Sequence, residues 1–443
     1  MDSEPKKDIE VAPALIAVHP YQCSVAVAVG HHLRVFDLLA GSAVSLTDDS
    51  AAVPFHTDNI RAIRFGAKGK LFVSAGDDKT VKVWSTESWS CITSVSSEKR
   101  VSAVAISDDG TYVCFADKFG LVWVVDLDPP LRDKKPSPLL SHYCSIITSL
   151  EFSPDGRFIL SADRDFKIRV SYNISKCRVR YCSFFFSVII ISISQVTCFP
   201  EKPLNGAHQI QSFCLGHTEF VSCLAFVQAL ECPQGLLLSG SGDSTVRLWN
   251  VDSGALLDTC EVAIKAGLVE SDGKAEEHDH AVTDLCTVLD GLLVAVAIQS
   301  LQGIILLSCN VSAKTLSVAK VVLMAGEAFV PTCLGSSPST GKLWMVTGVS
   351  NLPGCNYPAL ARVRVISGID VEQEPVVVGD DNIPGGEKLL ETLQGNASVD
   401  DNTFLAAAEA VKTAMDHLLI KKQYPSANRE SRKKCRNDRK LKG

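Results

Sequence analysis

The chain has 443 residues, of which 46% are apolar and 21% are charged, and its formal net charge is −7. This composition excludes collagen-like and intrinsically disordered classes and is typical of a globular protein. Ten Lys or Arg residues against two acidic ones give residues 421–443 a charge of +8, which leaves −15 for the rest. An acidic body with a short basic tail argues against a stand-alone nucleic-acid binder.

Targeting and metal-binding patterns are missing from the sequence. The first residues, MDSEPKKDIE, are charged and do not form the apolar core of a signal peptide. The longest apolar run, Phe184–Ser194, is shorter than the roughly 18 residues that span a bilayer. The sixteen cysteines include no CxxC pair. We therefore expect reduced, mostly buried thiols and neither a metal site nor a membrane segment.

The N-terminal part begins a series of β units. Residues 1–12 are predicted to be disordered. Pro13–Leu39 contains the alternating string AVAVGHHLRVFDL, which predicts the first unit.

The second unit, Phe55–Ser85, and the fifth, Leu215–Asn250, follow one plan. Each has a His, a strand, a turn, a strand with Ser, a tight turn with Asp, and a strand that reaches Trp. The matching residues are His56, Ser74, Asp78 and Trp84 in one copy, and His217, Ser239, Asp243 and Trp249 in the other.

Two weaker copies of the plan and two units recognised mainly by their alternating β segments complete the series. They are Ala103–Leu127, Ser149–Val170, Ala281–Leu323 and Val330–Ser367. Gly216-His217 and Trp249-Asn250 match the repeat of WD β-propellers, whose blades are about 40 residues long. One blade cannot bury both faces, but blades packed in a ring can. We predict an all-β, seven-bladed WD-repeat β-propeller over residues 13–375, with a C-terminal helix and a basic tail.

The His, Ser, Asp and Trp set is predicted to be a structural framework. Such residues can form a hydrogen-bonded relay that satisfies buried polar groups and fixes a turn. A catalytic triad of His217, Asp243 and Ser239 is the alternative, but an active site is seldom duplicated along a chain.

Residues 170–195, VSYNISKCRVRYCSFFFSVIIISISQ, interrupt the fourth unit. Their deletion would join SADRDFKIR to VTCFPEKPL, so we expect them to break the strand directly after Arg169. They begin with Val-Ser and end with Gln, which intron boundaries can encode, and a T-rich reading frame gives their Phe, Ser, Ile and Val. We interpret the stretch as a retained intron; a surface loop and a membrane hairpin are the alternatives. Its apolar second half is an aggregation hazard.

The character changes after about Val376. Pro384-Gly385-Gly386 predicts a linker over residues 376–400. Residues 401–443 are predicted to be an amphipathic helix and a basic tail. The apolar face of the helix is formed by Phe404, Leu405, Ala408, Val411, Met415, Leu418 and Leu419. The tail is open to three interpretations, a solvated tail, a nuclear localisation signal or an RNA contact.

Two strings carry a more specific resemblance. Ser153–Arg169 reads SPDGRFILSADRDFKIR, and Phe199–Leu224 contains SFCLGHTEFVS. They resemble the non-catalytic WD-repeat subunit of tRNA (guanine-N7) methyltransferase, and the resemblance extends over the propeller. It implies a protein with no cofactor of its own that stabilises a catalytic partner in a heterodimer. That partner would bind S-adenosylmethionine and form N7-methylguanosine in the variable loop of tRNA. The nucleus, and secondarily the cytoplasm, is the expected location.

The same resemblance implies a set of partner contacts. In this family the ADRD-x-KIR segment supplies charged groups to the catalytic subunit, which points here to Asp163, Arg164, Asp165, Lys167 and Arg169. Lys118, in the turn of the neighbouring unit, is a further candidate. Asp165 has a framework alternative because it aligns with Asp78 and Asp243, and Lys167 and Arg169 could be merely solvated. Because the insert follows Arg169 directly, we predict that the form that contains it binds the partner poorly.

A second class of function uses the same fold. A general WD-repeat adaptor, such as a ubiquitin-ligase substrate receptor or a chromatin factor, is the alternative. It has no reason to carry the two specific strings. No GxGxxG phosphate-binding motif lies at a strand-to-helix junction, which argues against an independent enzyme.

Overall fold

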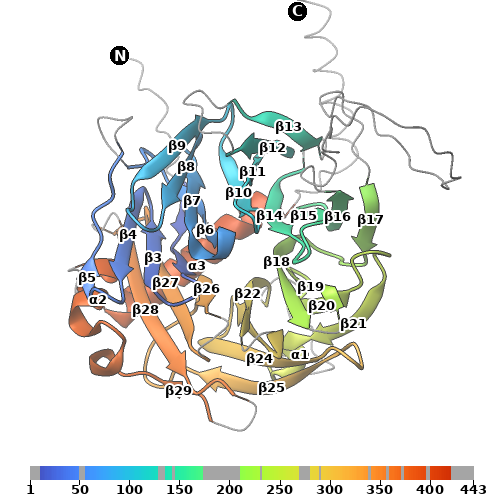
Figure 1. The fold of residues 1–443 in the computed structure, drawn as a ribbon. Helices are drawn as coiled ribbons and strands as arrows, with labels where there is room; N and C mark the ends of the chain where they lie inside the picture. Colours follow the sequence, from blue (N-terminus) through green and yellow to red (C-terminus); the bar gives the residue numbers. More distant parts are fainter. Residues whose placement is uncertain are drawn as a thin grey trace, which may run out of the picture.

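The structure is a computed structural model. It describes residues 10–48, 55–127, 135–141, 145–172, 210–229, 232–268, 280–288, 291–337, 341–355, 359–370, 374–395 and 400–420. Seven antiparallel sheets surround a central channel, which confirms the predicted seven-bladed propeller (Figure 1).

Each blade contributes strands in chain order from the channel outward. Blade one contains β2 (Leu15–Val18), β3 (Ser24–Val29), β4 (His32–Asp37) and β5 (Ser42–Ala43). Blade two contains β6 (Ile60–Gly66), β7 (Leu71–Gly76), β8 (Thr80–Ser85) and β9 (Cys91–Ser96), with the 3-10 turn η1 (Ala67–Gly69). Blade three contains β10 (Val101–Ile106), β11 (Tyr112–Asp117), β12 (Leu121–Asp126) and β13 (Ser137–Ser141). Blade four contains β14 (Ile147–Phe152), β15 (Phe158–Asp163), β16 (Lys167–Tyr172) and β17 (Ile210–Leu215).

The second half of the ring continues the pattern. Blade five contains β18 (Val221–Ala229), β19 (Cys232–Ser241), β20 (Thr245–Trp249) and β21 (Leu256–Glu261), followed by the short helix α1 (Val262–Lys265). Blade six contains β22 (Val282–Val288), β23 (Leu293–Ile298), β24 (Gly303–Asn310) and β25 (Thr315–Leu323). Blade seven contains β26 (Cys333–Ser336), β27 (Leu343–Ser350), β28 (Ala359–Ser367) and β29 (Val376–Val377), and it also receives β1 (Ala12–Pro13).

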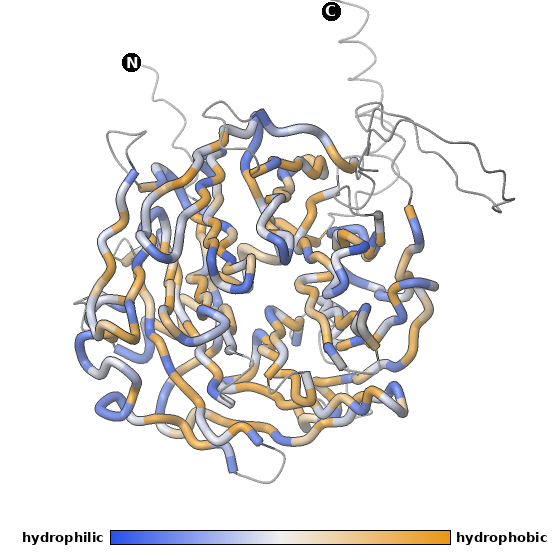
Figure 2. Tube along the Cα trace, in the orientation of Figure 1, coloured by the Kyte–Doolittle hydropathy of each residue, from blue (hydrophilic) through white to orange (hydrophobic). Residues whose placement is uncertain are grey.

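Burial explains why the middle strands of the blades give a clear apolar signal in the sequence. Strands β3, β11 and β23 are buried along their whole length, because neighbouring blades cover both faces. The hydropathy pattern follows this arrangement, with apolar strands and polar turns (Figure 2). Outer strands such as β9, with the sequence CITSVS, are partly exposed. This weak apolar signal left β9, β13 and β21 outside the predicted units.

The N-terminal residues close the ring. Ala12 and Pro13 of β1 pair with Ser350 and Val349 of β27, whose other end pairs with the inner strand β26. The prediction of a disordered segment over residues 1–12 is therefore wrong at its C-terminal end, while residues 1–9 lie outside the described residues. The pairing to a distant strand decides this conformation, and no local pattern could show it.

The predicted linker contains ordered structure. Residues 376–400 include β29, the 3-10 turn η5 (Asp380–Asn382) and helix α2 (Gly386–Gln394). Leu389, Leu390 and Leu393 of this helix pack against the cores of blades one and seven. Burial of this leucine face in the groove between two blades stabilises the helix, although Pro384-Gly385-Gly386 predicted a linker here.

The predicted C-terminal helix is α3 (Asp401–Leu419). Asp400 caps its N-terminus by accepting a hydrogen bond from the backbone N–H of Thr403. The buried face includes Ala407, whereas Leu405 is 39% exposed, which corrects the predicted face at one position. None of the described helices is long and apolar enough to cross a membrane.

The strand at the predicted insert is not broken. Strand β16 continues from Arg169 through Val170, Ser171 and Tyr172, and Tyr172 pairs with Phe158 of β15. Val170 and Ser171 are 0% and 1% exposed, so both faces of the strand are buried at these two positions. The expectation of a break directly after Arg169 is therefore wrong. The remainder of the insert, residues 173–195, lies outside the described residues.

Candidate functional site: a repeated framework and a surface on blade four

The two predicted polar relays form in blades two and five. His56 donates from Nδ1 to Asp78 Oδ2 at 2.8 Å, and its Nε2 lies 2.8 Å from the hydroxyl of Ser74. The indole N–H of Trp84 donates to the same hydroxyl at 3.0 Å. In blade five the corresponding separations are 2.9, 2.8 and 2.8 Å, among His217, Asp243, Ser239 and Trp249.

Each relay is buried, as expected for residues that stabilise the fold. His56 and His217 are 3% and 6% exposed, and Trp84 and Trp249 are buried. Burial lowers the pKa of His217, against the opposing effect of its hydrogen bond to Asp243. Burial alone would raise the pKa of Asp243, but hydrogen bonds from His217 and Thr245 hold it well below its ordinary value. In blade five, a neutral imidazole beside an ionised carboxylate satisfies the polar groups of the relay and fixes the turn.

Blades three and four use a different residue for the same turn. Asp163 accepts hydrogen bonds from the backbone N–H groups of Asp165 at 2.8 Å and Lys167 at 3.1 Å. Asp117 does the same in blade three. Asp163 is only 2% exposed, so its carboxylate belongs to the turn and is not available to a partner. This corrects the prediction for Asp163.

Asp165 occupies the turn position of Asp78 and Asp243, as the sequence suggested. Its carboxylate lies 3.9 Å from Nε of Arg164, and its side chain is 26% exposed. The framework role expected of Asp165 is thus carried in this blade by Asp163.

The two arginines of the segment are engaged within the propeller. Arg169 donates from Nη1 to the carbonyl of Ser141 in blade three at 2.8 Å, and its guanidinium lies 5.8 Å from the ring centre of Phe213. Arg169 pairs in register with Ser161 of β15, just as Lys82 pairs with Ser74 in blade two. Arg164 donates from Nη1 to the carbonyl of Leu418 in α3 at 3.4 Å.

An accessible surface remains on blade four, which we call the blade-four patch. It consists of Phe166, Lys167, Phe213 and Leu215. Lys167 is exposed, and Phe166, Phe213 and Leu215 are 40%, 40% and 59% exposed. Lys167 pairs with Leu215 in register, so the basic and apolar groups meet at one end of the blade.

The adjacent turn of blade three carries a similar pair. Lys118 is half-buried at the mouth of the channel, and the neighbouring Phe119 is 49% exposed. The sequence reasoning selected the charged residues and missed Phe119, Phe166, Phe213 and Leu215. A signal existed in the turns of blades three and four, where WD blades usually place polar residues and where this chain has Phe119 and Phe166.

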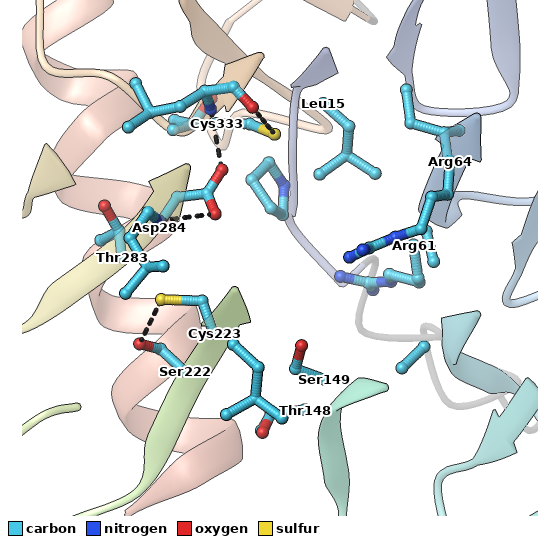
Figure 3. A pocket seen from close by; sticks show the side chains of 18 of the residues that line it. Leu15, Arg61, Arg64, Thr148, Ser149, Ser222, Cys223, Thr283, Asp284 and Cys333 are labelled. Atoms are coloured by element: carbon cyan, nitrogen blue, oxygen red, sulfur yellow. Dashed lines mark hydrogen bonds between the residues drawn. The ribbon is translucent and has the colours of Figure 1, made fainter. Parts of the chain in front are cut away.

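The inner strands enclose the central channel, a cavity of about 660 Å³ that α3 borders at one mouth. Arg64 of blade two donates to the carboxylate of Glu151 in blade four. Asp284 accepts from the backbone N–H groups of Leu285 and, across the seam to blade seven, Leu334. Figure 3 shows Arg61 and Arg64 on the opposite side of the cavity from Asp284. The Arg64–Glu151 and Leu334–Asp284 contacts join blades, so Arg64, Glu151 and Asp284 have structural roles.

The fold and the repeated relay define a WD-repeat β-propeller. A family model described as "tRNA methyltransferase TRM82 WD40 domain" matches residues 45–139 and 202–347, more than half of the sequence, and the chain belongs to this family. A second model, "WD domain, G-beta repeat", matches residues 134–170. Residues 171–201, which hold most of the predicted insert, are matched by neither model.

Curated relatives carry consistent names. The "tRNA (guanine-N(7)-)-methyltransferase non-catalytic subunit WDR4" of Homo sapiens is 31% identical over 249 residues, which are 56% of this chain and 52% of that protein. The Xenopus laevis protein of the same name is 28% identical over 327 residues, 73% of this chain and 71% of that protein. The chain spans about half the length of the human, Dictyostelium discoideum, mouse and bovine relatives.

Solved structures support the fold alone. The "Crystal structure of RRP9 WD40 repeats" superimposes with a TM-score of 0.55 at 15% identity, over 77% of this chain and 88% of that one.

Proposed function

We propose that this chain is the non-catalytic subunit of a tRNA (guanine-N7) methyltransferase. The match to the TRM82 family on both sides of the insert carries this proposal. The names of the human and Xenopus relatives, both non-catalytic subunits, support it. In this proposal the propeller binds and stabilises a separate catalytic subunit, and the heterodimer forms N7-methylguanosine in the variable loop of tRNA.

The chemistry of the reaction is assigned to the partner. S-adenosylmethionine would bind there, since the polar sets of this chain are repeated, buried and used by the fold. The propeller would therefore position and stabilise the catalytic subunit, which raises the fraction of that subunit in its active form.

The blade-four patch is the surface that we assign to the catalytic subunit. An exposed Lys beside Phe166, Phe213 and Leu215 offers both an apolar contact and a charge. Interfaces of this kind take most of their affinity from aromatic and basic anchors. The surface of the partner should accordingly be apolar with carboxylates that face Lys167 and, on blade three, Lys118.

The register of β16 changes the expected effect of the insert. The patch lies at the Lys167 end of the strand, and the insert leaves the strand after Tyr172. Five residues of strand, about 17 Å, separate Lys167 from Tyr172, while Phe213 of the patch pairs with Arg169, three residues before Tyr172. We therefore expect the form with the insert to keep its patch, contrary to the prediction of poor partner binding from the sequence.

Co-expression with a candidate methyltransferase subunit tests the proposal. We expect co-purification and N7-methylguanosine in tRNA that depends on both chains. Lys167→Glu should weaken partner binding by about tenfold or more, because it places a carboxylate opposite acidic groups of the partner. Lys79→Glu is the matched control, since Lys79 is exposed in the equivalent turn of blade two.

Two outcomes would contradict the proposal. Full methylation by the partner without this chain, in cells and in vitro, would remove its function. Equal binding by the Lys167→Glu and Lys79→Glu variants would remove the assigned surface. Arg169→Glu is a less informative probe, because Arg169 also holds the seam between blades three and four.

The cellular location is a separate part of the proposal. The ten basic residues of the tail over 421–443 would direct the chain to the nucleus, in addition to a cytoplasmic pool.

A further inference from the structure

A hydroxyl at or near the start of an inner strand joins several blades to the next blade. The Oγ of Ser102 and the Oγ1 groups of Thr148 and Thr332 each donate to a backbone carbonyl across a seam. The acceptors are Ile147 at 2.7 Å, Val221 at 2.5 Å and Ala14 at 2.8 Å. Each bond satisfies a buried polar group and fixes the distance between two blades at the channel.

The seam between blades five and six lacks this link within the described residues. Ser222 donates instead to Gly240 of its own blade at 3.0 Å. This sector of the mouth therefore depends on other contacts.

Helix α3 supplies those contacts. Leu419, at its C-terminal end, packs with Phe220, which precedes β18, and with Ala281, which precedes β22. All three side chains are at most 7% exposed. The end of the helix thus lies on the seam between blades five and six.

The other end of α3 is fixed to blade seven. Phe404, Ala407 and Val411 pack with Val349 and Leu360. A helix of 19 residues is about 28 Å long, which is enough to cross the mouth of the channel. Figure 1 shows α3 passing behind the central opening.

Arg164 connects this helix to blade four. Its guanidinium donates to the carbonyl of Leu418 at 3.4 Å, and its side chain is 21% exposed. A cation at a helix C-terminus satisfies an orphan carbonyl and interacts favourably with the helix dipole. Arg164 lies in the same turn as Phe166 and Lys167 of the blade-four patch.

We propose that α3 is a strap that closes the seam between blades five and six and, through Arg164, holds the turn of the blade-four patch in its partner-binding conformation. Arg164 is a positioning residue in this arrangement. The part that concerns the partner rests on the proposed function, whereas the strap itself is a property of the isolated chain.

Hydrogen exchange on the isolated full-length chain tests the strap. Leu419→Asp places a charge in the seam, so the amides of Val221, Val282, Asp165 and Lys167 should exchange roughly tenfold faster, equivalent to about 1.4 kcal/mol of local stability. The matched control is Leu405→Asp, on the same helix but 39% exposed, which should leave these amides unchanged. Affinity for the methyltransferase subunit should fall with Leu419→Asp and not with Leu405→Asp.

Arg164→Gln provides a second variant that keeps the apolar seam intact. We expect faster exchange at the last turn of α3, Met415–Ile420, and at Asp165 and Lys167, with no change at Phe404. Unchanged exchange at the blade-four turn in both variants overturns the proposal. Failure of the wild-type chain to bind any methyltransferase overturns the proposed function instead, and the exchange data still decide whether the strap exists.

Discussion

At several positions in this propeller, the residue type is explained by the need to form hydrogen bonds with polar groups that folding buries. The His, Ser, Asp and Trp relays occur in blades two and five, whereas blades three and four rely on Asp117 and Asp163. The sequence showed the first solution because it repeats as a set of four residue types. The second involves one aspartate and backbone amides, which leave no pattern in the sequence.

The buried relay makes a prediction about pH. Burial keeps His217 neutral and lowers its pKa in the folded state, whereas in the unfolded chain its pKa is about 6.5. The unfolded state therefore binds more protons below that pH, and stability falls as the pH drops. We expect His217 to account for at most about 2 kcal/mol of loss between pH 7 and 5.

Chemical denaturation at pH 5, 6, 7 and 8 measures this effect. His217→Gln should be less stable at pH 8, where the relay is lost, and should show a shallower decline toward pH 5. An equal slope in both proteins would contradict the prediction. The lowered pKa of Asp243 acts in a separate window, since its stabilisation is lost only as the pH falls below about 4.

At the scale of elements, strand β16 shows that the first residues of the predicted insert fit into a sheet. Val170 and Ser171 occupy buried positions in register with Leu160 and Ile159 of β15. Val196 and Thr197 would take these positions if residues 170–195 were deleted. Both pairs suit a strand, because Val and Thr are β-branched and Ser is small.

Two deletions of equal length test whether β16 is completed equally well by the residues that begin at Val170 or by those that begin at Val196. We expect the chain without residues 170–195 and the chain without residues 173–198 to unfold cooperatively, with melting temperatures within about 4 °C of each other. Both should aggregate less than the full chain, since both remove the apolar run Phe184–Ser194. Thermal unfolding with light scattering measures both effects. Loss of cooperative unfolding in the first deletion alone would show that β16 requires Val170–Tyr172.

For the whole molecule, the two ends of the chain secure the ring. Strand β1 completes the inner edge of blade seven, and α2 covers the groove between blades seven and one. Arg34 of blade one donates to the carbonyl of Leu393 at the end of α2 at 3.1 Å. Helix α3 then crosses the channel mouth, so residues beyond the last blade hold the ring together at two places.

The leucine face of α2 tests this role. Leu389 is fully buried between the two blades, so Leu389→Ala should lower the free energy of unfolding by about 2–5 kcal/mol. The neighbouring Lys388 is exposed, and Lys388→Ala should change stability by no more than about 0.5 kcal/mol. Urea denaturation gives both values. A loss below 1 kcal/mol in the first variant would show that the ring closes without α2.

The sequence alone determined the number of blades, the two relays and the C-terminal helix. These features depend on local alternation, turn residues and repetition, which a single chain displays directly. Only the tertiary structure decided that Ala12 joins blade seven, that the predicted linker holds α2, and that Asp163 and Arg169 are held inside the propeller. The pairing of Ala12, the burial of α2 and the bond from Arg169 to Ser141 depend on contacts between residues far apart in the chain, whereas Asp163 bonds to amides of its own turn. Long-range pairing and burial are set by the closure of the ring, because each blade becomes stable only when its neighbours cover its faces.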